Sequence, residues 1–193
     1  LKVIAGENNK ETMHMVINVL IKLDVEKVYF SPRMSSERKR IAGLIKPNES
    51  ILVMFSGSGV YPLVIAKNSK CREVYGIEIN PIAHKYALEN IKKNKLENKI
   101  KLFLGDANKV VPKLNKRFDR ILMPLPKEGE KFLGLALKFI KKNGVIHFYD
   151  FEQEDEFYKA VEKVKKSCDK LKKKLKILKT IKCGQYSPRF YRV

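Results

Sequence analysis

The sequence predicts a doubly wound α/β fold around a mostly parallel sheet. From residue 51 onward, short apolar runs alternate with longer stretches whose apolar residues recur at helical spacing, which is typical of successive β–α–β units. Glycine or acidic residues end the first three runs. The length of 193 residues suits one main domain that buries its own core.

Five apolar runs are expected to form strands, and three amphipathic stretches are expected to form helices. The expected strands are Ile51–Phe55, Val74–Ile79, Ile100–Leu104, Arg120–Met123 and Gly144–Tyr149. The expected helices are Val60–Asn68, Pro81–Asn94 and Glu128–Lys142. Asn80-Pro81 is a favourable helix start, because Asn caps a helix and Pro suits its first turn, and Asn143-Gly144 is typical of a helix end.

Both ends of the chain depart from this pattern. Residues 1–30 are expected to hold two strands around a polar turn at Glu7–Glu11, as the end of an N-terminal element or a linker. Glu152–Leu175 is predicted to be a basic amphipathic helix. Lys176–Ile181 and Phe190–Val193 are then expected to pair as an antiparallel hairpin at the sheet edge. We therefore expect the chain to be part of a longer protein.

The charge of the chain is strongly one-sided, with 41 Lys and Arg against 21 Asp and Glu, or +20 formally. Such an excess attracts polyanions, of which nucleic acid is the commonest. Lysine-rich surfaces of thermophile proteins instead come with many acids in ion-pair networks. We therefore predict nucleic-acid binding. The lysines of residues 159–182 form either a phosphate-binding face or a solvated one, and Tyr186 and Phe190, beside Arg189 and Arg192, either stack on an unpaired base or pack in the core.

Several classes of protein are disfavoured. No apolar run reaches the roughly 18 residues of a membrane helix, and residues 1–7 lack the features of a signal peptide. Cys71, Cys168 and Cys183 are isolated and odd in number, which argues against disulfides and against a metal knuckle. The three histidines are far apart. We expect a cytoplasmic protein without membrane or metal, and a monomer.

Glycines and acids end three successive predicted strands. Ser56, Gly57 and Gly59 follow the first strand, Glu78 ends the second, and Asp106 follows the third. Glycines let a ligand approach the backbone at the carboxyl end of the first strand, where open α/β sheets bind nucleotides. Glu78 is placed to accept both hydroxyls of a ribose, and Asp106 to accept from an adenine amino group or to cap the next turn. Together these residues predict an adenosine pocket.

An adenosine pocket suits both NAD and S-adenosylmethionine. The turn Gly57–Pro62 has proline where the third glycine of the dinucleotide fingerprint would stand. Close passage of a pyrophosphate over the helix start is then less favourable, and S-adenosylmethionine is the expected cofactor. Beside the residues above, Phe55, Ile79, Ala107 and Pro124 are expected to contact it.

Eight short motifs, in order along residues 25–150, carry a family resemblance. They are Tyr29–Arg33, Glu37-Arg38, Met54–Gly57, Glu78–Pro81, Asn90–Lys92, Leu104–Asp106, Met123–Lys127 and Gly144–Tyr149, with a weaker echo at Tyr186–Arg189. Together they resemble the archaeal and eukaryotic type of tRNA (guanine-37-N1) methyltransferase. A related enzyme of wybutosine synthesis, which transfers the aminocarboxypropyl group of the same cofactor to tRNA, is similar too.

The resemblance implies a class I methyltransferase sheet of seven strands, one of them antiparallel, with residues 31–193 as the catalytic domain. It also implies N-terminal domains that this chain mostly lacks. The implied activity is methylation of N1 of guanosine 37 in the anticodon loop of tRNA. In that family the Pro-Arg-x-x-x-Glu segment supplies catalysis, so Glu37 would take the proton from guanine N1 and Arg33 would stabilise negative charge on O6. Four residues apart, Arg33 and Glu37 would share one helix face, and an ordinary ion pair is the alternative.

Two positions depart from the family pattern. Val53 stands where the family has an acid, so a polar contact near the methionine part of the cofactor is missing. Pro124-Leu125-Pro126 replaces Asn-Leu-Pro, which removes an amide able to bind the target base. Two alternatives therefore stay open: transfer of the aminocarboxypropyl group to tRNA, and a domain that has lost catalysis and only binds tRNA.

Overall fold

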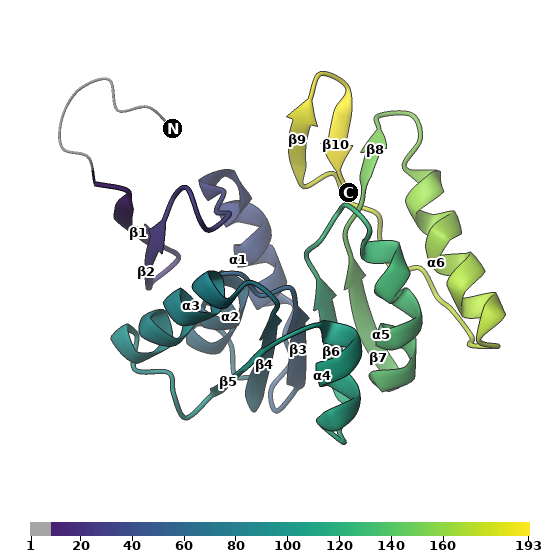
Figure 1. Ribbon diagram of the computed structural model, residues 1–193. Coiled ribbons are helices and arrows are strands. Elements are labelled where there is room, and N and C mark those ends of the chain that lie inside the picture. Colours follow the sequence, from purple (N-terminus) through teal and green to yellow (C-terminus); the bar gives the residue numbers. More distant parts are fainter. Residues whose placement is uncertain (1–8) are drawn as a thin grey trace.

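A five-stranded parallel sheet forms the centre of the computed structural model, which describes residues 9–193 (Figure 1). Its order is β5-β4-β3-β6-β7. The strands are β3 (Ser50–Met54), β4 (Glu73–Glu78), β5 (Ile100–Leu104), β6 (Phe118–Met123) and β7 (Ile140–Phe148). The chain runs outward from β3 through β4 to β5, and then returns to the other side of β3 for β6 and β7. This reversal places a switch point between β3 and β6, where doubly wound sheets bind ligands.

Helices cover both faces of the sheet, as the complete burial of β3 requires. Val53 packs in a core cluster with α1 (Ser35–Gly43), α2 (Val60–Asn68) and α3 (Pro81–Lys93). Leu52 and Met54 point to the opposite face, under α4 (Ala107–Lys113) and α5 (Leu133–Phe139). The helix α6 (Tyr158–Lys170) packs beside α5. The predicted doubly wound α/β fold is therefore confirmed.

The seven-stranded sheet that the family resemblance implied is wrong for residues 9–193. The last three strands form a separate antiparallel sheet of order β8-β10-β9. They are β8 (Phe151–Gln153), β9 (Gly184–Ser187) and β10 (Phe190–Arg192). Asp150 and Val193 exchange two backbone hydrogen bonds, of 3.0 and 2.9 Å, which seat β10 beside β8. Because β10 is paired on both sides, it does not extend the central sheet.

Three predicted elements of the second half differ from the structure. The helix expected over Glu128–Lys142 is a 3₁₀ turn, η2 (Gly129–Phe132), followed by α5, which ends at Phe139 because Ile140 already pairs with Phe118 of β6. Asn143-Gly144 therefore lies inside β7, at a register shift, and does not end a helix. The helix expected over 152–175 is divided between β8 and α6, and 176–181 forms no strand, since β9 pairs with β10 instead.

At the N-terminal side, β1 (Glu11–Val16) and β2 (Val19–Asp24) form an antiparallel hairpin. The turn residues Ile17 and Asn18 both have positive φ, 44° and 65°, as tight hairpins with the usual strand twist require. The strand expected before the Glu7–Glu11 turn lies outside the described residues. After that turn the chain forms two strands, where one was predicted.

Two asparagines, Asn90 of α3 and Asn94 directly after it, attach this hairpin to the core. The side chain of Asn90, which is fully buried, accepts from Lys22 N (2.8 Å) and donates to Lys22 O (2.9 Å) and Ser58 O (3.1 Å). One turn further on, the half-buried Asn94 accepts from Leu20 N (2.9 Å) and donates to Leu20 O (2.8 Å). Asn90 thus joins β2, α3 and the turn after β3 in one hydrogen-bond network.

We expect Asn90→Ala to lower the free energy of unfolding by about 3 kcal/mol, because it leaves buried backbone groups of Lys22 and Ser58 without partners. Asn94→Ala is the matched control and should cost about 1 kcal/mol, since water can reach the half-exposed site. Urea unfolding of both variants measures the difference. Equal losses would show that the Asn90 contacts do not carry the attachment.

Within residues 9–193 no helix is both long and apolar enough to cross a lipid bilayer. Over the same residues no group of three or more His, Cys, Asp or Glu side chains is arranged to hold a metal ion.

Candidate functional site

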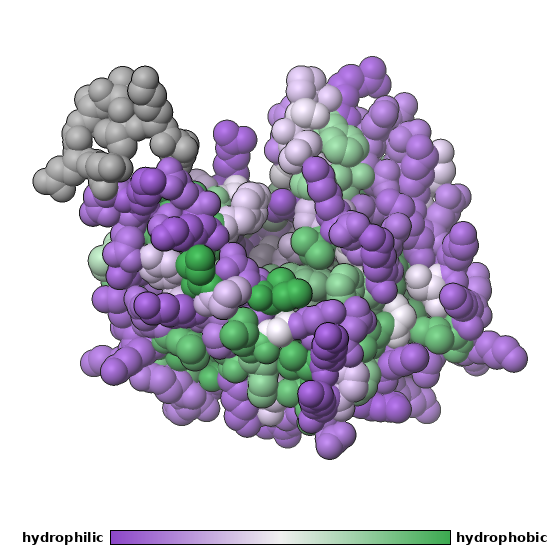
Figure 2. Space-filling model, viewed as in Figure 1, coloured by the Kyte–Doolittle hydropathy of each residue, from purple (hydrophilic) through white to green (hydrophobic). Residues whose placement is uncertain are grey.

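The carboxyl ends of the central strands lie under a hollow. Figure 2 shows it between the part of the molecule that carries β1, β2 and α1 and the part that carries β8, β9 and β10, with apolar surface on its floor. Ile79 and Leu104, at the ends of β4 and β5, are 66% and 51% exposed. Exposed aliphatic side chains beside polar strand ends suit a ligand with a flat apolar ring.

The turn between β3 and α2 offers backbone to a ligand. Phe55, Gly57 and Gly59 all have positive φ, at 61°, 56° and 83°. A Cβ added at Gly57 would meet nothing within 4 Å, so a ligand can approach there. A Cβ at Gly59 would lie 3.2 Å from the Cβ of Ala87, so this glycine lets α2 begin close to α3. The two glycines therefore serve different purposes.

Glu78 is fixed by backbone donors on both sides. Its Oε2 accepts from Gly57 N (2.7 Å) and its Oε1 from Asn80 N (2.8 Å), with the residue only 9% exposed. Each carboxylate oxygen has a second lone pair, so Glu78 can still accept from two ligand hydroxyls. Asp106 caps α4 through Oδ1, which accepts from Asn108 N (2.8 Å), and its other oxygen can accept from a ligand. Both predicted acids thus stand at the predicted strand ends.

The other predicted contact residues have mixed exposures. The ring of Phe55 packs edge-on against Phe132, with ring centres 4.8 Å apart. Ser56 is 6% exposed, and its buried Oγ has no hydrogen-bond partner among the described residues. Ala107 is 4% exposed, so its side chain belongs to the core, and Pro124 is half-buried directly after β6. Among the predicted contact residues, Gly57 and Glu78 are joined by a hydrogen bond. Ala107 can contact a ligand only through its backbone, because its side chain is buried.

The structure separates the two predicted catalytic residues. Arg33 lies exposed in the 3₁₀ turn η1 (Pro32–Met34), whereas Glu37 of α1 is 5% exposed. No hydrogen bond or ion pair joins them within residues 9–193. Glu37 instead binds Arg40 in a two-point ion pair, with 2.6 Å from Nε to Oε2 and 2.7 Å from the second guanidinium nitrogen to Oε1. The hydrogen bonds with Glu37 raise the pKa of Arg40 above its usual value.

Tyr149, which follows β7, completes the surroundings of Glu37. Its hydroxyl donates to Glu37 Oε1 at 2.5 Å and lies 3.3 Å from the hydroxyl of Tyr61. Burial raises the pKa of Tyr149 well above 10 and that of Tyr61 to about 12. Both phenols therefore keep their protons at neutral pH. Glu37 is consequently held by one cation and one neutral donor.

Arg38 is a buried cation beside this cluster. It is 5% exposed and lies over the rings of Phe30 and Tyr61, at 5.2 and 5.8 Å from their centres. Two of its nitrogens, Nε and one terminal nitrogen, are buried without a hydrogen-bond partner among the described residues. Burial lowers the pKa of Arg38. A guanidinium held in this way is a ready donor to a ligand oxygen.

Sequence reasoning did not single out Arg40 or Tyr149. Arg40 stands three residues after Glu37, a spacing that places both on one helix face, so its pairing was visible in the sequence. Tyr149 is 112 residues away from Glu37 along the chain, and the sequence marked it only as the last residue of a predicted strand and of the motif Gly144–Tyr149.

Comparison with known proteins places the chain in a family. A family model described as the TRM5/TYW2 methyltransferase domain matches residues 12–178. The chain belongs to the TRM5/TYW2 methyltransferase family. The predicted resemblance is thereby confirmed.

Two relatives with different named activities are similar to this chain. The tRNA (guanine(37)-N(1))-methyltransferase Trm5b of Pyrococcus abyssi is 39% identical over an alignment of 191 positions, which covers 98% of this chain and 56% of that protein. The tRNA(Phe) (4-demethylwyosine(37)-C(7)) aminocarboxypropyltransferase of Methanocaldococcus jannaschii is 37% identical over an alignment of 194 positions, which covers 100% of this chain and 76% of that protein. The chain spans about half the length of Trm5b.

Solved structures of TRM5/TYW2 proteins share the fold. The crystal structure of Trm5b from Pyrococcus abyssi matches with a TM-score of 0.89 and 38% identity, covering 98% of this chain and 56% of that one. The crystal structure of M. jannaschii TYW2 in complex with AdoMet also gives a TM-score of 0.89, at 35% identity, covering 99% and 86%. These matches agree with a central parallel sheet and helices on both faces.

Proposed function

We propose that the chain is the catalytic part of an S-adenosylmethionine-dependent enzyme that methylates N1 of guanosine 37 in the anticodon loop of tRNA. The observation that carries this proposal is the buried carboxylate of Glu37, which Arg40 and Tyr149 hold near the ends of the central strands. The name of the Pyrococcus abyssi relative supports the same reaction. In this proposal residues 31–193 form the catalytic domain, and the β1–β2 hairpin is attached to it through Asn90 and Asn94.

The residues at the strand ends fit S-adenosylmethionine. Gly57 leaves open space beside the backbone, the buried Oγ of Ser56 has no partner among the described residues, and Glu78 is fixed in place. The residues proposed to hold the cofactor are Phe55, Ser56, Gly57, Gly59, Glu78, Ile79, Asp106, Ala107 and Pro124. When bound, the cofactor supplies an electrophilic methyl group on a sulfonium.

The chain's own residues supply the acid–base chemistry in this proposal. Glu37 takes the proton from guanine N1, because N1 is a poor nucleophile while it is protonated. Arg40 and Tyr149 orient the Glu37 carboxylate. We propose Arg33 as the cation that stabilises the negative charge developing on guanine O6. The buried Arg38 provides a second cation on the same segment.

The basic surface supports tRNA as the partner. In α6, Ala160, Val164 and Cys168 face the core, while Lys165, Lys166 and Lys170 are exposed. Lysines continue along the exposed residues 172–180 and at the exposed Lys182. Such a face binds phosphates without sequence preference and weakens with salt. The proposal also includes a monomer that acts in the cytoplasm without a metal.

Transfer of a labelled group to tRNA tests the proposal. The protein is incubated with tRNA and cofactor labelled either on the methyl group or on the aminocarboxypropyl group, and the nucleosides are then separated by mass spectrometry. Methyl label in 1-methylguanosine is the expected result. Absence of label from tRNA with both cofactors would overturn the proposal.

The aminocarboxypropyl transfer is the second candidate. The Methanocaldococcus jannaschii relative that is named for this activity aligns with 100% of this chain and with 76% of its own length. The departures at Val53 and Pro124 also leave it open. In the same experiment, run with tRNA that carries 4-demethylwyosine at position 37, this reaction would put only the aminocarboxypropyl label into tRNA.

We expect Gly57→Ala to weaken S-adenosylmethionine binding at least about tenfold, because the new methyl group projects into the space that the cofactor would occupy. Gly134→Ala in α5 is the control for a methyl group added in open space, and only Gly57→Ala also strains the backbone, because Gly57 has a φ of 56°. Isothermal titration calorimetry measures both affinities. Unchanged binding in Gly57→Ala would place the cofactor elsewhere.

A further inference from the structure

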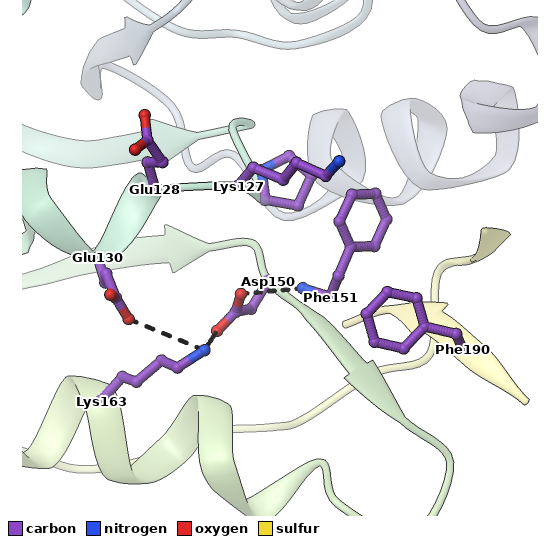
Figure 3. A pocket seen from close by; sticks show the side chains of 8 residues that line it. Lys127, Glu128, Glu130, Asp150, Phe151, Lys163 and Phe190 are labelled. Carbon is purple, nitrogen blue, oxygen red and sulfur yellow. Dashed lines mark hydrogen bonds and ion pairs between the residues drawn. The ribbon is translucent and has the colours of Figure 1, made fainter. Parts of the chain in front are cut away.

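A second cavity lies beside the proposed catalytic cluster. Its volume is about 280 Å³, and it is lined by the loop after β6, the end of β7 and the small β8-β10-β9 sheet. Figure 3 shows Phe151 and Phe190 together on one side, with Glu130, Lys163 and Asp150 on the other. The cavity thus combines an aromatic wall with a charged one.

Phe151 and Phe190 line the apolar wall, and the ring of Tyr186 packs against both of them. The ring centres of Phe151 and Tyr186 are 4.5 Å apart, and that of Phe190 lies 5.8 Å from each. Tyr186 is 56% exposed, and both phenylalanines are only half-buried. The sequence left two roles open for Tyr186 and Phe190, stacking on an unpaired base or packing in the core. Their exposure shows that neither ring is fully packed in the core. Exposed rings on a rigid sheet are surfaces on which unpaired bases stack.

Cations surround these rings. Lys127 Nζ lies 5.5 Å from the ring centre of Tyr186, and the guanidinium of Arg192 lies 5.2 Å from that of Phe151. Arg189 is exposed in the turn between β9 and β10. In a chain of net charge +20, this rim favours a ligand that carries phosphates.

The opposite wall supplies acceptors. Lys163 Nζ binds Asp150 (2.6 Å) and Glu152 (2.9 Å) and lies 3.8 Å from Glu130. One ammonium thus faces three carboxylates, and this raises the pKa of Lys163 above its usual value. The side chain of Glu130 is 51% exposed, so its carboxylate can accept from a ligand. Carboxylates accept from the amino groups of bases and repel their carbonyl oxygens.

We propose that this cavity binds an unpaired base of the RNA substrate other than the modified one, and that the preferred base carries an exocyclic amino group. The inference rests on the proposed function, since it takes RNA as the substrate. Residues that line the cavity are neighbours in sequence of residues in or near the proposed catalytic cluster. Its residue Asp150 follows Tyr149, which binds Glu37, and Pro126 stands two residues after Pro124. A nucleotide near the target in the loop is therefore the expected occupant.

The test is a cycle of RNA and protein changes, measured as binding of fluorescently labelled tRNA by anisotropy. One set of tRNAs carries a single abasic nucleotide at each loop position. The protein variants are Tyr186→Ala and, as a matched control, Tyr158→Ala, which removes an equally exposed ring (55%) from α6. For the wild type, one abasic position other than the target should weaken binding by about 5- to 100-fold. That loss should largely disappear in Tyr186→Ala and persist in Tyr158→Ala.

The base preference is tested at the position so found. Cytidine there should bind more tightly than uridine to the wild type, and Glu130→Gln should remove this difference, because an amide can both donate and accept. The inference is overturned if Tyr186→Ala and Tyr158→Ala respond alike to every abasic tRNA, or if uridine binds as well as cytidine. Because binding is measured without the cofactor, a protein that transfers no group but shows the predicted coupling would contradict the proposed function and not this site.

Discussion

Glu37→Gln is expected to slow methyl transfer to guanine N1 by about 10²–10⁴-fold, the range that one general base contributes. The amide keeps the size of the side chain and can still accept from Tyr149, but it cannot take the N1 proton. The rate constant is measured in a single turnover with saturating cofactor and tRNA, so that binding does not limit it. A rate within threefold of the wild type would remove Glu37 from the base role.

Tyr149→Phe provides the graded comparison. It keeps the carboxylate and its two contacts with Arg40 but removes the 2.5 Å hydrogen bond to Glu37. A hydrogen bond to a charged group contributes about 1.5–3 kcal/mol, so the expected loss of rate is about 10- to 150-fold. Both variants should bind S-adenosylmethionine as the wild type does. Loss of cofactor affinity would instead indicate that the cluster supports the fold of the site.

The strand ends of the proposed cofactor site were predictable because they depend on local features. An apolar run followed by Ser56-Gly57, and another that ends in Glu78, each specify a strand and the polar group after it. The parallel arrangement then brings these ends to one edge of the sheet, and the hydrogen bond from Gly57 N to Glu78 Oε2 follows from that register. Sequence and structure agree here without knowledge of distant contacts.

The proposed catalytic cluster was only half predictable because it depends on packing between distant elements. The motif marked the position of Glu37. The helix α1, however, points the side chain of Glu37 into the core, where it accepts a hydrogen bond from Tyr149, the residue after the edge strand β7 of the central sheet. Arg33 precedes α1, in η1, and therefore does not share the face that a continuous helix would give it. Asn143-Gly144 failed as a helix end for a similar reason: pairing of Ile140 with Phe118 begins β7 before the local signal is reached.

A second large effect concerns stability at low pH and centres on His147 in β7. Its Nε2 lies 2.7 Å from a terminal nitrogen of Arg120, which also binds Glu49 through Nε (2.8 Å). Burial, together with the charges of Arg120 and Arg40, lowers the pKa of His147 from 6.5 to about 3. The imidazole is therefore neutral in the folded protein and accepts from Arg120. In the unfolded chain it gains a proton at its ordinary pKa.

Between pH 6.5 and 3 the unfolded state thus binds more protons at this residue, so the free energy of unfolding falls as the pH is lowered. Because the side chain is half-buried, we expect about 3 kcal/mol from His147 over this window, somewhat less than the full shift would give. Carboxylates with lowered pKa, such as Glu73 at about 2, act in the same direction. A pH series with the wild type alone would therefore not separate their contribution from that of His147.

His147→Gln isolates the histidine, because the amide oxygen can still accept from Arg120 but does not titrate. Urea unfolding at pH 7, 5.5 and 4.5 should show a smaller loss of stability for the variant than for the wild type, with the two curves converging as the pH falls. The carboxylates contribute equally to both curves, so the difference between them reports His147 alone. Parallel curves would mean that the imidazole in the folded protein takes up its proton as readily as in the unfolded chain, and that Arg120 does not exclude the charge.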